Sequence, residues 1–132
     1  MLSSTGNGFG VVYARASDFK LEVQPLNSAG QAVGSPRVIG QAAITASPSR
    51  QIAMVWTGSQ YVVLFYHNKP QAQLVDHTGA PVGDPLVLPS CMSFSFGHRA
   101  AAWQSGRLAV VYEAGLSGPP HSGICLAVLK LK

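Results

Sequence analysis

Four aromatic residues carry the chemistry that this sequence most readily offers to a ligand: Trp56, Tyr66, Trp103 and Tyr112. An aromatic ring can stack on the apolar face of a sugar, and the indole N–H or phenol O–H then adds a hydrogen bond. Large aromatic side chains also dominate hydrophobic cores, and the two tryptophans occupy equivalent positions of a repeat. The four residues are therefore candidates for a ligand site, with core packing as the alternative for each.

Groups that could perform catalysis are few and far apart in the chain. Five acidic residues are present, and the four histidines fall in four separate segments, at His67, His77, His98 and His121. A serine or cysteine nucleophile needs a base beside it, and no Gly-x-Ser-x-Gly elbow occurs. Zinc sites use closely spaced Cys and His residues, which this sequence lacks. We therefore predict no catalytic residue, no metal ligand and no cofactor.

Two cysteines, Cys91 and Cys125, can form one disulfide in an oxidising compartment. Each lies in or beside a predicted strand, and the alternative is a pair of separate buried thiols. Both interpretations stay open, because the geometry that a disulfide requires cannot be taken from the sequence.

The charge and hydropathy patterns exclude two classes of partner. The formal net charge is +4, but the cations are scattered singly and form no cluster for a nucleic acid. No stretch of about 18 apolar residues occurs, so we predict no membrane span.

Residues 1–8 have neither the basic start nor the apolar run of a signal peptide. Only 11% of the residues are charged, which suits an extracellular β-protein, and we expect a location outside the cell or at its surface.

The candidate residues are positioned by an internal repeat. The segment 27–36 recurs at 76–85, and four residues are identical at one spacing of 49 positions. The first members of these pairs are Gly30, Val33, Gly34 and Pro36. Four identities at one spacing are difficult to obtain by chance, so we interpret the two segments as copies.

Two further matches extend the repeat over most of the chain. The segment 5–13 matches 57–65 at an offset of 52, and 100–103 mirrors 53–56 at an offset of 47. We expect the first copy to lack its opening strand, and the third to lack the Asp-x-x-Gly turn and the last strand. The chain is thus treated as a single repeat domain over 1–132, with approximate units 5–45, 50–90 and 98–132.

The second unit shows the expected elements most clearly. Apolar, β-branched and aromatic runs predict strands at 52–56, 61–66 and 72–75. A fourth strand is expected to start at 85–88, at a sheet edge where proline costs no ladder hydrogen bond. The segments 57–60 and 76–79 have turn chemistry, and no segment has convincing helical periodicity.

This pattern resembles a repeat found in large bacterial secreted proteins. Residues 53–63, followed by 73–82, contain an apolar strand that ends in Trp, a Gly-containing turn, a strand that begins with Tyr, and the sequence Leu-Val-Asp-His-Thr-Gly. The resemblance implies tandem β-propeller blades outside the cell or at its surface, and it is nearly silent on function. Asn27 stands where that family has Asp, which preserves the turn role.

We therefore expect an all-β fold of about two and a half to three propeller-like blades of four strands each. Closed propellers use about 4–8 blades, so oligomerisation or additional blades should complete the ring. The alternative is a β-trefoil, which also uses three units of about this length.

The expected function is that of a non-enzymatic module, secreted or at the cell surface, that binds a glycan or a protein. The alternative is a purely structural subunit that assembles with itself into a shell, fibre or coat. A propeller of the glycoside hydrolase kind is the third hypothesis. The expected partners are further copies of the chain or additional blades, together with a glycan.

Overall fold

The computed structural model describes residues 1–42, 52–88, 96–115 and 122–130, and it describes the side chains of all these residues except 96–100, 112–115 and 122–125. The regular elements in the described ranges are all β-strands, and no helix occurs among them. The expectation of an all-β fold is therefore confirmed.

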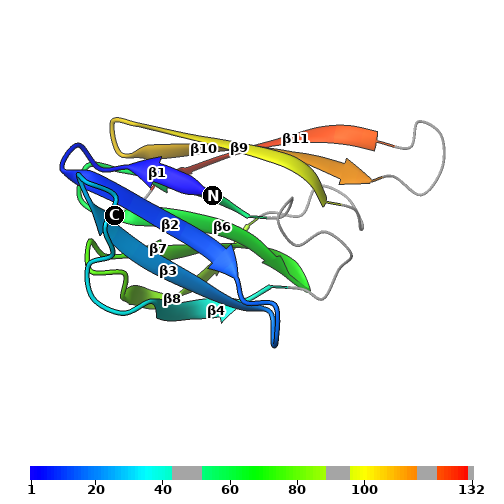
Figure 1. Ribbon diagram of the computed structural model, residues 1–132. Helices are drawn as coiled ribbons and strands as arrows, with labels where there is room; N and C mark the ends of the chain where they lie inside the picture. The colour runs from blue at the N-terminus through cyan, green and yellow to red at the C-terminus, as the bar shows by residue number, and fades with distance from the viewer. Residues whose placement is uncertain (43–51, 89–95, 116–121, 131–132) are drawn as a thin grey trace.

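The strands form three antiparallel sheets in which each strand pairs with the next one along the chain (Figure 1). The first sheet contains β1 (Leu2–Ser4), β2 (Gly8–Ala14), β3 (Lys20–Asn27) and β4 (Arg37–Gln41). The second sheet contains β5 (Ala53–Trp56), β6 (Tyr61–His67), β7 (Lys69–Val75) and β8 (Pro81–Val87). The third sheet contains β9 (Phe96–Gln104), β10 (Arg107–Gly115) and β11 (Ser122–Lys130). The three sheets thus span residues 2–41, 53–87 and 96–130.

Two strand predictions need correction. The first unit does have an opening strand, because Leu2–Ser4 pairs with residues Phe9, Gly10 and Val11 of β2. Three residues are too few to show periodicity in a sequence, so the prediction that this strand is missing was wrong. The last strand of the second unit begins at Pro81, four positions before the predicted start, since Pro81 already pairs with Val75. Proline at the first position of a strand costs no ladder hydrogen bond.

The sequence repeat is also a repeat of hydrogen bonds at the turns. In the first unit, the Asn27 side-chain oxygen accepts the backbone N–H groups of Ala29 and Gln31, at 3.0 and 2.9 Å. In the second unit, Asp76 Oδ1 accepts the backbone N–H groups of Thr78 and Ala80, at 2.8 and 2.9 Å. Each turn ends in a glycine with positive φ, which is 77° at Gly30 and 86° at Gly79.

The two turns should respond differently to acid. Hydrogen bonds to the Asp76 carboxylate, the first of them from Thr78, hold the pKa of this group below its usual value. A carboxyl whose pKa is lowered by folding stabilises the protein above its unfolded pKa of about 3.9, and this stabilisation is lost as the pH falls through the lower folded pKa. We expect Asp76→Asn to reduce the acid-induced fall in the unfolding midpoint, and Asn27→Asp to increase it. Urea titrations from neutral pH to below pH ~3 would measure both, and identical pH profiles for the three proteins would contradict the expectation.

A second repeated contact ties each turn segment to its sheet. The Gln73 side-chain amide donates to the backbone oxygens of Leu74, Val82 and Gly83, at 2.9, 3.3 and 3.1 Å. Gln24 lies 49 positions earlier and makes the equivalent contacts in the first sheet. Gln73 is buried and Gln24 is half-buried, because the first sheet covers Gln73 whereas nothing in the described structure covers Gln24.

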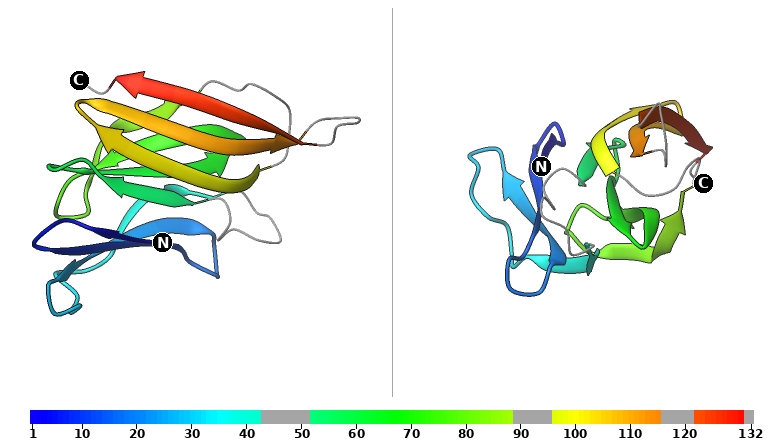
Figure 2. Two further views of the ribbon diagram at one scale, coloured as in Figure 1. Left: turned by 90° about the horizontal axis from the view of Figure 1, so that it is seen from above. Right: turned by 90° about the vertical axis from the view of Figure 1, so that its right-hand side faces the viewer.

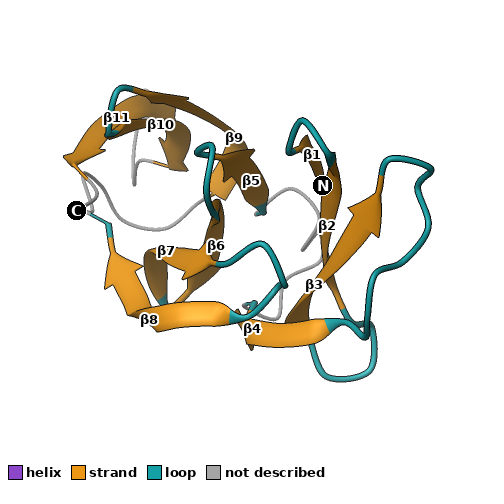
Figure 3. Cartoon of the chain, turned by 90° about the vertical axis from the view of Figure 1, so that its left-hand side faces the viewer, coloured by secondary structure: helices purple, strands orange, loops and turns teal. Residues whose placement is uncertain are grey.

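The three sheets stack face to face, with the second sheet in the middle (Figure 2). Their opening strands are neighbours, since β5 contacts both β1 and β9 (Figure 3). The core therefore has two parts. One lies between the first and second sheets and includes Val12, Leu21, Val63 and Phe65. The other lies between the second and third sheets.

The strand β6 contributes to both parts of the core. Its side chains alternate between the two faces of the sheet, so that Val63 and Phe65 face the first sheet while Val62 and Leu64 pack with residues of the third. All four are essentially inaccessible to solvent. The continuous apolar run at 61–65 thus reflects a strand that is covered on both faces.

Candidate functional site

An opening that combines aromatic and polar groups lies between the first and second sheets, at the end that carries the β1–β2, β3–β4, β5–β6 and β7–β8 turns. It has a volume of about 500 Å³, and we call it the turn cleft. The residues of its lining that matter for recognition are Asn7, Pro25, Asn27, Trp56, Ser59, Tyr61 and His77. Ligand sites in proteins are usually clefts of about 300–1,000 Å³ with apolar walls and a few polar groups, and the turn cleft has these properties.

The turn after β5 brings Trp56 against Tyr61. The Thr57 hydroxyl donates to the Gln60 backbone oxygen at 2.9 Å and accepts the Gln60 N–H at 3.2 Å, which closes the turn tightly. Gly58 has a φ of 102°, a conformation that favours glycine. Trp56 and Tyr61 are consequently paired across β5 and β6, with ring centroids 4.7 Å apart and planes tilted by 59°. Trp56 remains half-buried, so part of its side chain is accessible at the cleft.

The Tyr61 ring packs closely against the backbone of Gly10 in the first sheet. A Cβ atom at Gly10 would lie 2.6 Å from the nearest carbon of the Tyr61 ring, so a larger residue there would collide with this ring. The ring is only 2% exposed, and its burial raises the pKa of the hydroxyl above the usual tyrosine value. Tyr61 is therefore a neutral residue over the whole physiological pH range.

The polar groups of the turn cleft differ in their availability. The Asn27 side-chain oxygen accepts the backbone N–H groups of Ala29 and Gln31, and its Nδ2 donates to the Gln31 side chain. By contrast, the side chains of Asn7, Ser59 and His77 make no hydrogen bond to any described residue. Among the described residues that line the cleft, none is Asp, Glu, Lys or Arg. This environment suits a neutral ligand with several hydroxyl groups better than an anion or a cation.

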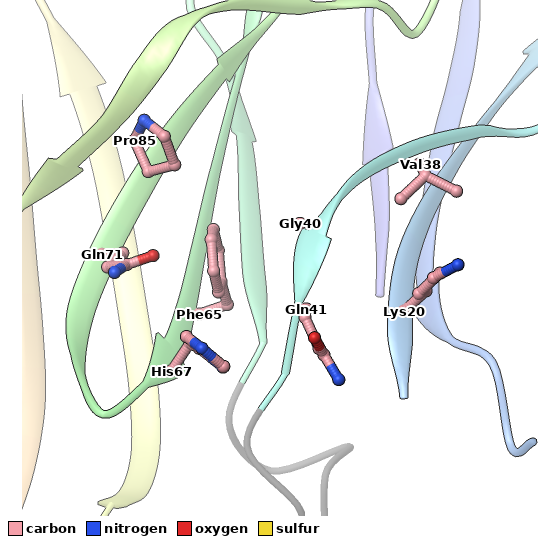
Figure 4. Close-up of a pocket in the computed structure, with 8 residues that line it drawn as sticks. All are labelled: Lys20, Val38, Gly40, Gln41, Phe65, His67, Gln71 and Pro85. Atoms are coloured by element: carbon pink, nitrogen blue, oxygen red, sulfur yellow. The ribbon is translucent and has the colours of Figure 1, made fainter. Parts of the chain in front are cut away.

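A second opening, the edge cleft, lies between the same two sheets near the strands β4 and β8 (Figure 4). Its volume is about 370 Å³, and its lining is mostly apolar around Phe65. Gly40 faces this ring, and a Cβ atom there would lie 3.1 Å from it. His67 and Lys20 also line the edge cleft, and the buried His67 Nδ1 has no hydrogen-bond partner among the described residues. The smaller volume and the lack of an accessible tryptophan make this the weaker candidate for a sugar.

The structure separates the four aromatic residues that the sequence offered as candidates. Trp56 lines the turn cleft and also packs against the core between the first and second sheets. Tyr66 lies near the opposite end of β6, where its hydroxyl donates to the Asn68 backbone oxygen at 3.0 Å. Trp103 packs against the core between the second and third sheets. Tyr112 lies in β10, but its side chain falls outside the described part. The described residues therefore place one of the four at a cleft.

The predicted disulfide cannot be placed. Cys91 lies outside the described residues, and Cys125 lies in β11, where its side chain is not described. The bridge between them stays a prediction.

Three polar residues of the turn cleft were not singled out as candidates from the sequence. Asn7 and Ser59 occupy equivalent turns, 52 positions apart, and His77 lies within the Asp76 turn. Turn residues of repeated units gather at one end of stacked sheets, which is the signal that could have identified them. Among the described residues, no group of three His, Cys, Asp or Glu lies close enough to hold a metal ion.

Comparisons of the chain with protein-family models, with curated proteins and with solved structures gave no match. In the described ranges there is also no helix with the length and apolar character needed to cross a membrane.

Proposed function

We propose that the chain is a non-enzymatic, propeller-type repeat module, outside the cell or at its surface, that binds a neutral glycan in the turn cleft. The observation that carries this proposal is the accessible Trp56 ring in a cleft whose described lining has amide, hydroxyl and imidazole groups but no formal charge from Asp, Glu, Lys or Arg. An indole ring stacks on the apolar face of a sugar, and free polar side chains then bind its hydroxyl groups.

The arrangement of the sheets supports the propeller part of the proposal. Each unit forms its own antiparallel sheet, the sheets stack face to face, and their opening strands are neighbours. A propeller repeats such sheets around a common axis. A β-trefoil would be a less natural description of three separate meandering sheets.

Three of the described carboxylates are engaged by partners, which supports a binding role over hydrolysis. Asp18 and Glu22 both contact Arg15, at 2.6 and 3.1 Å. The hydrogen bond from Arg15 holds the pKa of Asp18 well below its usual range. A glycosidase needs one carboxyl with a raised pKa to protonate the leaving group, which is the opposite of what Arg15 does to Asp18. Asp76 is engaged by its own turn.

Glycan binding can be tested with the two tryptophans, because the chain contains only these two. An array of neutral glycans would identify a ligand, and fluorescence titration would then measure its affinity. In the Trp103→Phe protein, the remaining Trp56 emission should change on binding. In the Trp56→Phe protein, the Trp103 emission should stay constant, because Trp103 packs against the core between the second and third sheets.

Removal of the ring should weaken binding. We expect Trp56→Ala to raise the dissociation constant about tenfold, which corresponds to ~1.4 kcal/mol and to the usual strength of an aromatic contact. Trp103→Ala is the control and should bind normally if its circular dichroism is unchanged. Absence of binding by the folded wild type to every neutral glycan, or an unchanged affinity in Trp56→Ala, would overturn the proposal.

A specific observation also favours the second hypothesis, a structural subunit that assembles with itself. The outer faces of the first and third sheets carry exposed large apolar side chains, among them Leu2, Leu126 and Val128. Exposed apolar patches of this kind usually mark interfaces.

A further inference from the structure

The outer faces of the first and third sheets are equivalent, through the sequence repeat, to surfaces that are buried inside the stack. We define the front face as the outer side of the first sheet, with Leu2, Val11 and Tyr13. We define the back face as the outer side of the third sheet, with Val111, Leu126 and Val128. Leu2, Leu126 and Val128 are 57%, 68% and 58% exposed. Each of these sets lies on one side of its sheet, since Leu2 pairs with Val11 and Val111 pairs with Leu126.

The front face is equivalent to the surface of the second sheet that the first sheet covers. At the repeat offset of 52, Tyr13 is equivalent to Phe65, and Val11 is equivalent to Val63. Phe65 and Val63 are buried in the core between the first and second sheets. The first sheet covers them with its inner face, which includes Val12. With Val11 and Tyr13, the front face therefore repeats positions at which the second sheet receives the inner face of the first sheet.

The back face is a copy of the opposite surface of the second sheet. At the offset of 47, Val111 is equivalent to Leu64. Its strand partner Leu126 corresponds to Ala72, because Leu64 pairs with Ala72 in the same way. Leu64 and Ala72 are buried by the third sheet, whereas Val111 and Leu126 are exposed.

The two exposed faces are thus the two halves of the interface that the chain already forms twice internally. We propose that the back face of one copy of this chain packs on the front face of a second copy, head to tail. The contact continues the stacking of the first sheet on the second and of the second on the third. Both halves belong to one chain, so the partner that fits each face best is another copy of the chain. Such a heterologous contact closes into a ring or continues as a filament, according to the rotation between copies.

This inference does not depend on glycan binding, because none of the six residues that define the two faces lines the turn cleft. A failure of one proposal therefore leaves the other standing. A glycan titration tests the turn cleft, and the molecular mass in solution tests the two faces.

Two variants test the direction of the contact. The front-blocked variant carries Leu2→Arg with Tyr13→Arg, and the back-blocked variant carries Leu126→Arg with Val128→Arg. All four side chains are at least 36% exposed, so the isolated chain should tolerate arginine there. Light scattering should give a mass of twice one chain or more for the wild type, and the mass of one chain for each variant alone. An equal mixture of the two variants should regain a mass of two chains, since each supplies the intact face that the other needs.

The mixture also controls for folding, because an unfolded variant could not restore association. Val87→Arg, at a residue that is 59% exposed on β8 and outside both faces, should associate like the wild type. A wild type with the mass of a single chain would overturn the proposal and leave the faces to another partner. Association of either blocked variant alone would overturn the head-to-tail arrangement, because it requires two identical faces to meet.

Discussion

Replacement of Phe65 by alanine should lower the free energy of unfolding by about 3–5 kcal/mol, the usual cost of removing a buried phenylalanine ring. The Phe65 side chain is 1% exposed in the core between the first and second sheets. Its ring is also the apolar centre of the edge cleft, where it faces Gly40. The neighbouring backbone at Gly40 has no side chain that could fill the space, so a cavity should remain. Urea denaturation followed by circular dichroism would measure the loss.

The repeat supplies a matched control for this substitution. Tyr13 is equivalent to Phe65 in the first unit but lies on the front face and is 36% exposed. In the back-blocked background, which should keep the chain monomeric, Tyr13→Ala should cost less than about 1 kcal/mol. Similar losses for the two substitutions would contradict the assignment of Phe65 to the inside and Tyr13 to the outside of the stack.

Gly10→Ala should lower the free energy of unfolding, because the added methyl group would collide with a side chain of the second sheet. The added Cβ would lie 2.6 Å from the Tyr61 ring, and Tyr61 is itself confined by Trp56. Overpacking of this kind costs about 1–3 kcal/mol, because the ring must leave its rotamer or the two sheets must separate. The unfolding midpoint in urea would measure the loss.

A double-mutant cycle separates this collision from a general effect on β2. Tyr61→Leu removes the ring atoms that Gly10→Ala would meet, so the cost of Gly10→Ala should largely disappear in the Tyr61→Leu background. Additive losses in the double variant would show that the collision with Tyr61 is not the cause.

The arrangement of strands could be predicted from the sequence because the repeat spacing and the turn residues are local signals. Asn27 and Asp76 mark equivalent turns in the sequence, and the side chains of both accept backbone hydrogen bonds within these turns. The strand Leu2–Ser4 was missed because three residues carry no period. The start of β8 at Pro81 was missed because proline normally lowers the expectation of a strand.

The candidate site was harder to predict because it depends on the neighbouring unit. The repeat makes Trp56 and Trp103 equivalent, but the sheets that they face differ. Trp56 belongs to the sheet that faces Gly10, whereas the second sheet has Val62 at the equivalent position. The small glycine accommodates Tyr61 beside Trp56 at the turn cleft. A pattern within one unit cannot show which residue the adjacent unit places opposite it.

The burial of β6 on both faces determines the order in which the molecule can come apart. A sheet at either end can detach and still leave β6 covered on its other side, whereas exposure of β6 on both sides requires the loss of both contacts. In a stack where each unit contacts only its neighbours, fraying therefore begins at the ends and reaches the centre last. Each outer sheet has one internal interface, which it forms with the central sheet. The loss of that one interface therefore detaches an outer sheet from the stack, whereas the central sheet must lose two.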